Sequence, residues 1–190
     1  MKKKGWLVMV LAGVMAGAAW GAEAKEEKAP EKAPEKAQVI SYLGMKKCKM
    51  CHKNQYESWA KTPHAASLKN LAAAKPEAVQ KMADALGVKI EGKPELAPAC
   101  LSCHVTGYGL EGGYTVEKGK EDMSDAVTCE ECHGPGSLHM KAKKEDKAKT
   151  IAGQPGEAKC RTCHTKEMSP EFDFKKYSEK GVHEHISKKK

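Results

Sequence analysis

The chain has 190 residues, with 33 Lys and Arg against 25 Asp and Glu and an aromatic content of 5%. From position 39 onward only 21 of 152 residues, about 14%, are Leu, Ile, Val or Phe, below the roughly 20% at which a charged chain ordinarily stays disordered. So few aliphatic side chains cannot offset the entropy lost on folding. The composition therefore excludes an ordinary globular enzyme with an aliphatic interior, and something other than side chains must fill the core.

The N-terminus has the pattern of an export signal. Met1–Gly5 carries three lysines, Trp6–Trp20 is an apolar run of 15 residues, and Ala22-Glu23-Ala24 offers an A-x-A cleavage site. We predict a Sec-type signal peptide over residues 1–24, because a membrane anchor would need about 20 apolar residues. The protein is then expected to be periplasmic, with an extracellular location as the alternative, and without stable membrane insertion.

Residues 25–38 form a predicted linker. They read KEEKAPEKAPEKAQ, with four Lys, four Glu and a recurring APEK unit. Balanced charge with interspersed proline is typical of a disordered, extended spacer. The folded domain is therefore expected at residues 39–190.

All eight cysteines fall in four C-x-x-C pairs, and a histidine follows each pair at once. The pairs are Cys48/Cys51, Cys100/Cys103, Cys129/Cys132 and Cys160/Cys163, and the histidines are His52, His104, His133 and His164. Disulfides and zinc sites also use paired cysteines, but neither requires a histidine at that offset four times. C-x-x-C-H is the attachment signature of c-type haem, in which two thiols bind one porphyrin edge and the histidine is the proximal iron ligand. We predict four c-type haems.

Four haems on so short a chain must lie edge to edge or face to face. The predicted fold is mainly α and loop-rich, with a core formed by the four covalently bound haems. Four further histidines, His64, His139, His183 and His185, are candidates for the second axial positions. Four bis-histidine irons would have low reduction potentials.

Several linked motifs extend this pattern from about Tyr42 to His183. They are C-x2-C-H-x3-Y-x2-W-x4-H near the start, C-L-S-C-H-V-T-G-Y-G, C-E-E-C-H-G-P-G-S-L-H, and F-D-F-K-K-Y with a late histidine. In these motifs the chain resembles the cytochrome c-554 family of tetrahaem cytochromes. The resemblance implies a mostly helical fold with parallel-stacked and near-perpendicular haem pairs, and distal ligands that lie far from their motifs in sequence.

The resemblance also implies particular iron ligands. By position, His64, His139 and His183 match the distal ligands, which we assign to the third, first and fourth haems respectively. In that family the second haem has no sixth ligand from the protein, so the iron above His104 would be five-coordinate. Other residues offer alternatives for that position: His185, Met45, Met50, Met82, Met123, Met140 and Met168.

The remaining segments are interpreted as structural. Helices are expected over 75–87, where Pro76 begins and Gly87 ends the helix, over 138–149, and from Ser169-Pro170 to Gly181. The run 141–149 has five Lys against two acids, and is interpreted as a solvated helix face, with partner docking as the alternative. Gly107–Gly112 is formally G-x-G-x-x-G, but it follows an attachment motif and not a strand, so we expect a turn-rich loop.

Together these features favour electron transfer between redox-partner proteins through closely packed haems. One alternative is small-molecule chemistry at an open iron above His104, because the resembling family includes a cytochrome that serves hydroxylamine oxidation and can reduce nitric oxide. A second alternative is a subunit of a conducting cytochrome filament. We expect an electron carrier and no nucleic-acid partner.

Overall fold

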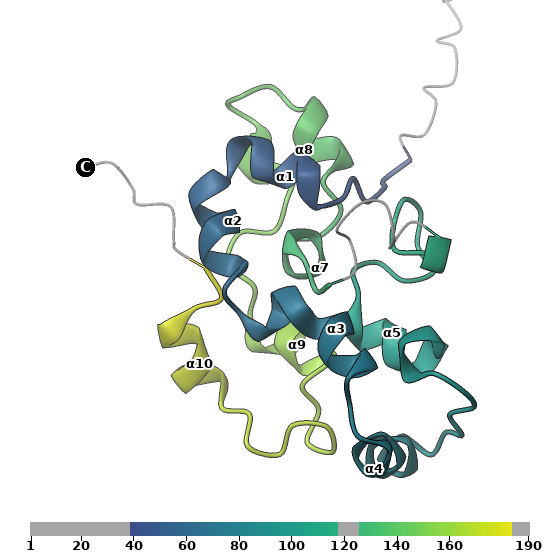
Figure 1. Ribbon diagram of the computed structural model, residues 1–190. Helices are drawn as coiled ribbons and strands as arrows, with labels where there is room; N and C mark the ends of the chain where they lie inside the picture. Colours follow the sequence, from purple (N-terminus) through teal and green to yellow (C-terminus); the bar gives the residue numbers. More distant parts are fainter. Residues whose placement is uncertain (1–38, 118–125, 184–190) are drawn as a thin grey trace, which may run out of the picture. The chain divides into compact units, whose positions relative to one another are not determined.

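The computed structural model describes residues 39–117 and 126–183 (Figure 1). The expected signal peptide, the linker and His185 lie outside these residues. The described helices are α1 (Met45–Cys51), α2 (Lys53–Trp59), α3 (Ser67–Ala72), α4 (Pro76–Leu86), α5 (Pro98–His104), α7 (Cys129–His133), α8 (Ser137–Lys141), α9 (Glu157–Arg161) and α10 (Phe174–Lys180), with 3₁₀ turns at Pro63–Ala66, Pro94–Leu96 and Lys147–Lys149. The described residues contain no β-strand, and none of their helices is long and apolar enough to cross a membrane.

Each C-x-x-C-H motif coincides with a short helix. Helix α1 carries both cysteines of the first motif, α5 and α7 carry the whole of the second and third, and α9 ends within the fourth. One helical turn places the two sulfurs of a motif on one side, with the histidine adjacent. Isolated helices of five to seven residues are not stable in water, so these turns depend on packing.

The buried apolar core is small. One cluster joins Met45, Trp59 and Ala126, and the other joins Leu101, Val105 and Tyr114. Trp59 donates its Nε1–H to the carbonyl of Val127 at 3.0 Å, which links the first motif's helix pair to the segment before the third motif. Around these clusters α1 packs on α2 and α7, and α3 packs on α5 (Figure 1).

A buried carboxylate ties the N-terminal segment to the third motif. Glu130 is 1% exposed, and its oxygens accept backbone N–H bonds from Leu43 at 3.0 Å, Gly44 at 2.8 Å and Gly136 at 2.6 Å. Hydrogen bonds to an ionised group are stronger than neutral ones. One side chain, between two attachment cysteines, therefore holds both the segment that leads into α1 and the loop after α7.

The expected helix over 75–87 is confirmed. Helix α4 begins at Pro76, and Gly87 stops it with a left-handed φ of 65°. A residue without a Cβ adopts this conformation at no steric cost.

Two other helix predictions were wrong in extent. The helix expected over 138–149 ends at Lys141, because the Lys147 ammonium donates to the carbonyl of His139 at 2.7 Å and that of Met140 at 3.4 Å. Continuing the helix would use those carbonyls for its own backbone bonds.

The last helix begins at Phe174 and not after Ser169. Asp173 is its N-cap and accepts the backbone N–H of Lys176 at 3.0 Å. Ser169 instead has its hydroxyl against the imidazole of His164, so it is not available as a cap.

The glycine-rich segment after the second motif is a loop, as expected. Gly107, Gly109 and Gly112 all have positive φ, and Glu111 accepts a backbone bond from Tyr42 at 2.9 Å. A Cβ on Gly112 would overlap the carbonyl oxygen of Tyr42. The loop thus packs against the N-terminal segment.

Candidate haem-attachment sites

Three of the four motif histidines face a second imidazole from a distant part of the chain. His52 and His139 have ring centres 6.2 Å apart, inclined at 31°. His133 and His183 are 5.9 Å apart at 32°. The rings of His64 and His164 are 6.0 Å apart at 87°.

This spacing fits an iron held between two imidazoles. A metal–imidazole nitrogen bond is about 2 Å, and the ring centre lies about 1 Å beyond the nitrogen, so two rings on opposite sides of one haem iron are about 6 Å apart. The donor set and its separation therefore suit a bis-histidine haem at each of the three motifs.

Two of the three expected distal histidines face a different motif from the one assigned to them by position. His139 faces the first motif's histidine, as expected. His64 faces His164 of the fourth motif, and His183 faces His133 of the third. The expected partners of His64 and His183 were therefore exchanged, because sequence distance does not say which segments the fold brings together.

Hydrogen bonds orient several of these imidazoles. The Nδ1 atom lies 2.7 Å from the Ala152 carbonyl in His133 and 3.0 Å from the Lys147 carbonyl in His139. A carbonyl only accepts, so Nδ1 carries the proton and Nε2 presents its lone pair. Binding of the second nitrogen to a protein oxygen is the usual arrangement of a metal-ligating histidine.

Two further motif histidines, His164 and His104, have a similar contact. Nδ1 of His164 is 3.0 Å from the hydroxyl of Ser169, and Nδ1 of His104 is 3.2 Å from the carbonyl of Ser67. Ser67 also donates its own hydroxyl to the carbonyl of His104 at 2.7 Å. The backbone and ring of His104 are thus both held by one residue of α3.

Burial lowers the pKa of His52, His64 and His164 and so favours their neutral form, and neighbouring positive groups add to the effect. The neutral imidazole is the form that coordinates a metal.

Attachment cysteines of different motifs contact each other. The thiols of Cys48 in the first motif and Cys129 in the third lie near enough to shift each other's pKa, raising that of Cys48 and lowering that of Cys129. Cys103 in the second motif and Cys163 in the fourth are neighbours in the same way, with the pKa of Cys103 lowered and that of Cys163 raised. The first and third motifs are therefore neighbours, and so are the second and fourth.

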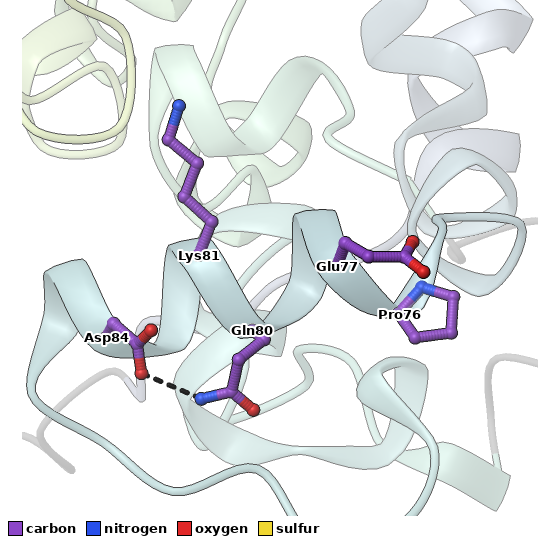
Figure 2. A pocket seen from close by; sticks show the side chains of 5 residues that line it. All are labelled: Pro76, Glu77, Gln80, Lys81 and Asp84. Carbon is purple, nitrogen blue, oxygen red and sulfur yellow. Dashed lines mark hydrogen bonds between the residues drawn. The ribbon is translucent and has the colours of Figure 1, made fainter.

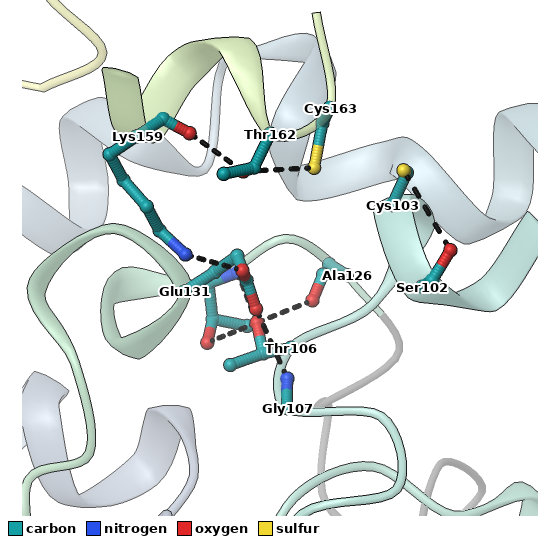
Figure 3. Close-up of polar contacts among 10 residues, drawn as sticks. Ser102, Cys103, Thr106, Gly107, Ala126, Glu131, Lys159, Thr162 and Cys163 are labelled. Carbon is teal, nitrogen blue, oxygen red and sulfur yellow. Dashed lines mark hydrogen bonds and ion pairs between the residues drawn. The ribbon is translucent and has the colours of Figure 1, made fainter. Parts of the chain in front are cut away.

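Glu131 joins three of the motifs (Figure 3). Its Oε1 is 2.9 Å from the ammonium of Lys159, just before the fourth motif, and its Oε2 accepts the backbone N–H of Gly107, just after the second, at 3.1 Å. The carboxylate is only 16% exposed, so this pair is better shielded than a surface ion pair. The two acids of the third motif, Glu130 and Glu131, thus connect it to segments beside the other three.

The second motif differs from the other three. Among the residues that the structure describes, no second imidazole lies opposite His104. Met45 and Met140, two alternatives for that position, lie at other motifs: Met45 contacts Cys129, and Met140 follows His139.

A shallow hollow lies on α4 (Figure 2). It is lined by Pro76, Glu77, Gln80, Lys81 and Asp84, and Gln80 donates to Asp84 at 2.7 Å. It contains no cysteine or histidine, and it is a solvated helix face.

Sequence reasoning missed the residues that support the ligands. Glu130 and Glu131 do not stand out by spacing, since they act on segments distant in sequence. Ser169 and the Lys147 carbonyl lie five and eight residues from the histidines they contact, but no motif marks them. The only signal was the choice of two acids inside the third C-x-x-C pair.

Three helical C-x-x-C-H turns each have an imidazole that faces a second imidazole, at a distance that suits an iron between them. This arrangement is typical of a c-type cytochrome. The family model described as cytochrome c554 and c-prime matches residues 47–134. Cytochrome c-554 of Nitrosomonas europaea is 44% identical over 101 residues, which are 49% of this chain and 38% of that relative. The structure of the reduced state of cytochrome c554 from Nitrosomonas europaea superposes with a TM-score of 0.59 at 29% identity, covering 78% of this chain and 87% of that one.

Residues 47–134 are thus similar to the cytochrome c554 and c-prime family, and the fold of this chain is similar to that of cytochrome c554. The matched region spans well under half the length of the curated relative.

Proposed function

We propose that this chain is an exported tetrahaem c-type cytochrome that carries electrons between redox-partner proteins. The observation that carries the proposal is the set of three imidazole pairs at 5.9–6.2 Å, each built on a C-x-x-C-H turn. The similarity to the cytochrome c554 family supports electron transfer by c-type haem.

The chain's residues have distinct roles in this proposal. The eight motif cysteines form the thioether bonds, and His52, His104, His133 and His164 are the proximal ligands. His139, His183 and His64 are the distal ligands of the first, third and fourth motifs. When bound, each haem iron takes up and releases one electron, and groups held side by side exchange electrons with one another.

The contacts between motifs favour one connected set of sites. Cys48 lies beside Cys129 and Cys103 beside Cys163, so the motifs are neighbours in twos. The Glu131–Lys159 ion pair, with its 2.9 Å contact, then joins the third motif to the fourth. The four attachment turns are thereby neighbours of one another.

Mass and redox measurements on the purified holoprotein test the proposal. The intact mass should equal that of residues 25–190 plus four haems, and a potentiometric titration should show four one-electron transitions at low potential. A mass with fewer haems, or a protein that takes up no electrons, would contradict it. Retention of residues 1–24 in the mature protein would contradict export with cleavage.

A second candidate function is supported by the surroundings of His104. The other three motif histidines face an imidazole, whereas in the described residues His104 is held only from its Nδ1 side, by Ser67. An iron with one open position binds small ligands such as nitric oxide. EPR should then show one high-spin iron in four, and carbon monoxide should bind to one reduced haem; a wholly low-spin spectrum would exclude this function.

A further inference from the structure

Two lysine-rich segments meet at the His52–His139 pair. His52 lies at the junction of α1 and α2, and His139 lies in α8, with the two ring centres 6.2 Å apart. The run 141–149 folds back onto α8, because His139 and Lys147 exchange two hydrogen bonds, of 3.0 and 2.7 Å. The start of α8 also lies beside the segment that leads into α1, because Ser41 and Ser137 exchange two hydrogen bonds.

We call the exposed lysines of these two segments the lysine surface. Its members are Lys46, Lys47, Lys49, Lys53, Lys141, Lys143, Lys144 and Lys149.

The positive charge is concentrated in these two segments. Residues 45–59 have four Lys against one Glu, and residues 141–149 have five Lys against two acids. Residues 67–117, which contain the second motif, have five Lys against six acids. Of the three segments compared, the two at the first motif therefore carry the excess of lysine.

Most of this charge is available to a partner. Lys53 is 3.8 Å from Glu57 and Lys149 is 2.8 Å from Asp146, and both pairs are exposed, so they hold their charges only weakly. Lys47, Lys141, Lys143 and Lys144 make no ion pair with any residue that the structure describes. A second protein can therefore engage them without breaking a strong contact.

An apolar patch lies within the lysine surface. Met50 is 69% exposed and Met140 is 41% exposed. Lys46 and Lys47 precede Met50 by one helical turn, so they share its face of α1. Between Met50 and His52 lies Cys51, the exposed one of the eight attachment cysteines. Flexible methionine inside a charged rim suits a contact that forms and separates repeatedly.

We propose that the lysine surface is the docking site for an acidic electron-transfer protein. This inference rests on the proposed electron-transfer function. A carboxylate-rich partner would be attracted by the eight lysines and would contact Met50 and Met140 beside Cys51. An anionic membrane is the less suitable occupant, since two exposed methionines offer little apolar surface to insert among lipids.

Stopped-flow reduction of the holoprotein tests the proposal, with reduced flavodoxin as an acidic protein probe. One electron leaves the flavin hydroquinone, which becomes the semiquinone, and one ferric iron becomes ferrous. The test variant is Lys47→Gln/Lys144→Gln. The matched control is Lys81→Gln/Lys93→Gln, which removes the same charge from exposed lysines in the segment 67–117.

At low salt the test variant should react at least about threefold more slowly than the native protein, and the control by less than about twofold. Raising the salt from about 10 mM to about 500 mM should remove the difference. A neutral reductant, lumiflavin semiquinone, should reduce all three proteins at the same rate.

Other outcomes would overturn the docking site without touching the proposed function. Equal slowing in the control would mean that only net charge matters. A shifted haem potential with an unchanged salt dependence would mean that the lysines serve the haem propionates. Binding to phosphatidylglycerol vesicles that the test variant abolishes, with native flavodoxin kinetics, would make the surface a lipid site. Failure of lumiflavin to reduce the protein would instead contradict the electron-transfer function itself.

Discussion

In the proposed haem sites, the donor strength of each imidazole Nε2 depends on what its Nδ1 contacts. In His164 that contact is a single hydroxyl, Ser169 Oγ, at 3.0 Å from Nδ1. An Nδ1–H bond of this kind makes Nε2 a stronger donor, which favours the ferric state of the iron it binds. A hydroxyl is also the easiest of these contacts to remove, since the others use backbone carbonyls.

Ser169→Ala should therefore raise the reduction potential of one haem. Loss of about 1 kcal/mol of differential hydrogen bonding corresponds to a shift on the order of tens of millivolts for a one-electron couple. A spectroelectrochemical titration should resolve one transition moving upward while the spectrum stays low-spin. Ser178→Ala, which removes only a hydroxyl bonded to the carbonyl of Lys175 on the surface of α10, is the control and should leave all four transitions in place.

The buried carboxylate of Glu130 is the other residue on which several segments depend. Glu130→Ala would leave the backbone N–H groups of Leu43, Gly44 and Gly136 without their acceptor. An unsatisfied buried donor costs about 1–3 kcal/mol, so we expect a loss of at least about 2 kcal/mol and a Tm lower by about 5 °C for a chain of this size.

Thermal unfolding of the holoprotein followed by circular dichroism would measure the effect of Glu130→Ala. Glu57→Ala is the comparison, because this exposed glutamate makes only a 3.8 Å surface pair with Lys53 and should change stability by less than about 0.5 kcal/mol. Similar Tm values for the two variants would show that Glu130 does not hold these segments.

At the scale of elements, helix α10 positions the proposed ligand His183. Helix α10 has seven residues and ends at Lys180, three positions before His183. Its N-terminus is capped by Asp173, whose carboxylate accepts the N–H of Lys176. So short a helix has little stability of its own, and the cap is a large part of what holds it.

Asp173→Ala should loosen His183 from its position opposite His133. Loss of an N-cap costs about 1 kcal/mol, which raises the population of the frayed helix about fivefold. In a mild denaturant series, EPR should detect high-spin iron at a lower denaturant concentration than in the native protein. Asp173→Asn keeps a capping oxygen and should behave as the native protein does; an equal effect of both substitutions would point to charge and not to capping.

The helices show where local sequence was sufficient and where it was not. Pro76 and Gly87 bound α4 as expected, because both act through their own backbone geometry. The helix expected over 138–149 ended early because the Lys147 side chain reaches back across several residues to two carbonyls. The C-terminal end of α8 thus depends on a contact that no local pattern contains. The N-terminal end of α10 depends on its cap, Asp173.

The candidate ligands divide in the same way. Attachment cysteines and proximal histidines are set by a five-residue motif, so their positions could be predicted. The distal partners are set by the fold. By position His64 was assigned to the third haem and His183 to the fourth, whereas the structure places them against His164 and His133 respectively. A position in sequence says that an imidazole is available but not which helix will come to face it.

For the whole molecule, the shortage of apolar side chains is visible in the structure. Nine hydrophobic residues of the described ranges are buried, and six of them form two small separate clusters. Three of the largest fully buried side chains are Met45, Leu101 and Val105, and the fourth is the carboxylate Glu130. In the proposed tetrahaem protein, the haems would supply the remaining packing surface.

The same chain without its haems should not fold. Its attachment helices have five to seven residues, well below the about 12 needed for marginal stability in isolation, and their few apolar contacts cannot offset the entropy of ordering about 150 residues. Residues 25–190 produced in a reducing cytoplasm, where haem is not attached, should give the far-UV circular dichroism of an unfolded chain and no cooperative thermal transition. The holoprotein in the same buffer should be helical and unfold cooperatively. A helical apoprotein with a sharp transition would mean that the side chains alone suffice as a core, and that the low aliphatic content has another cause.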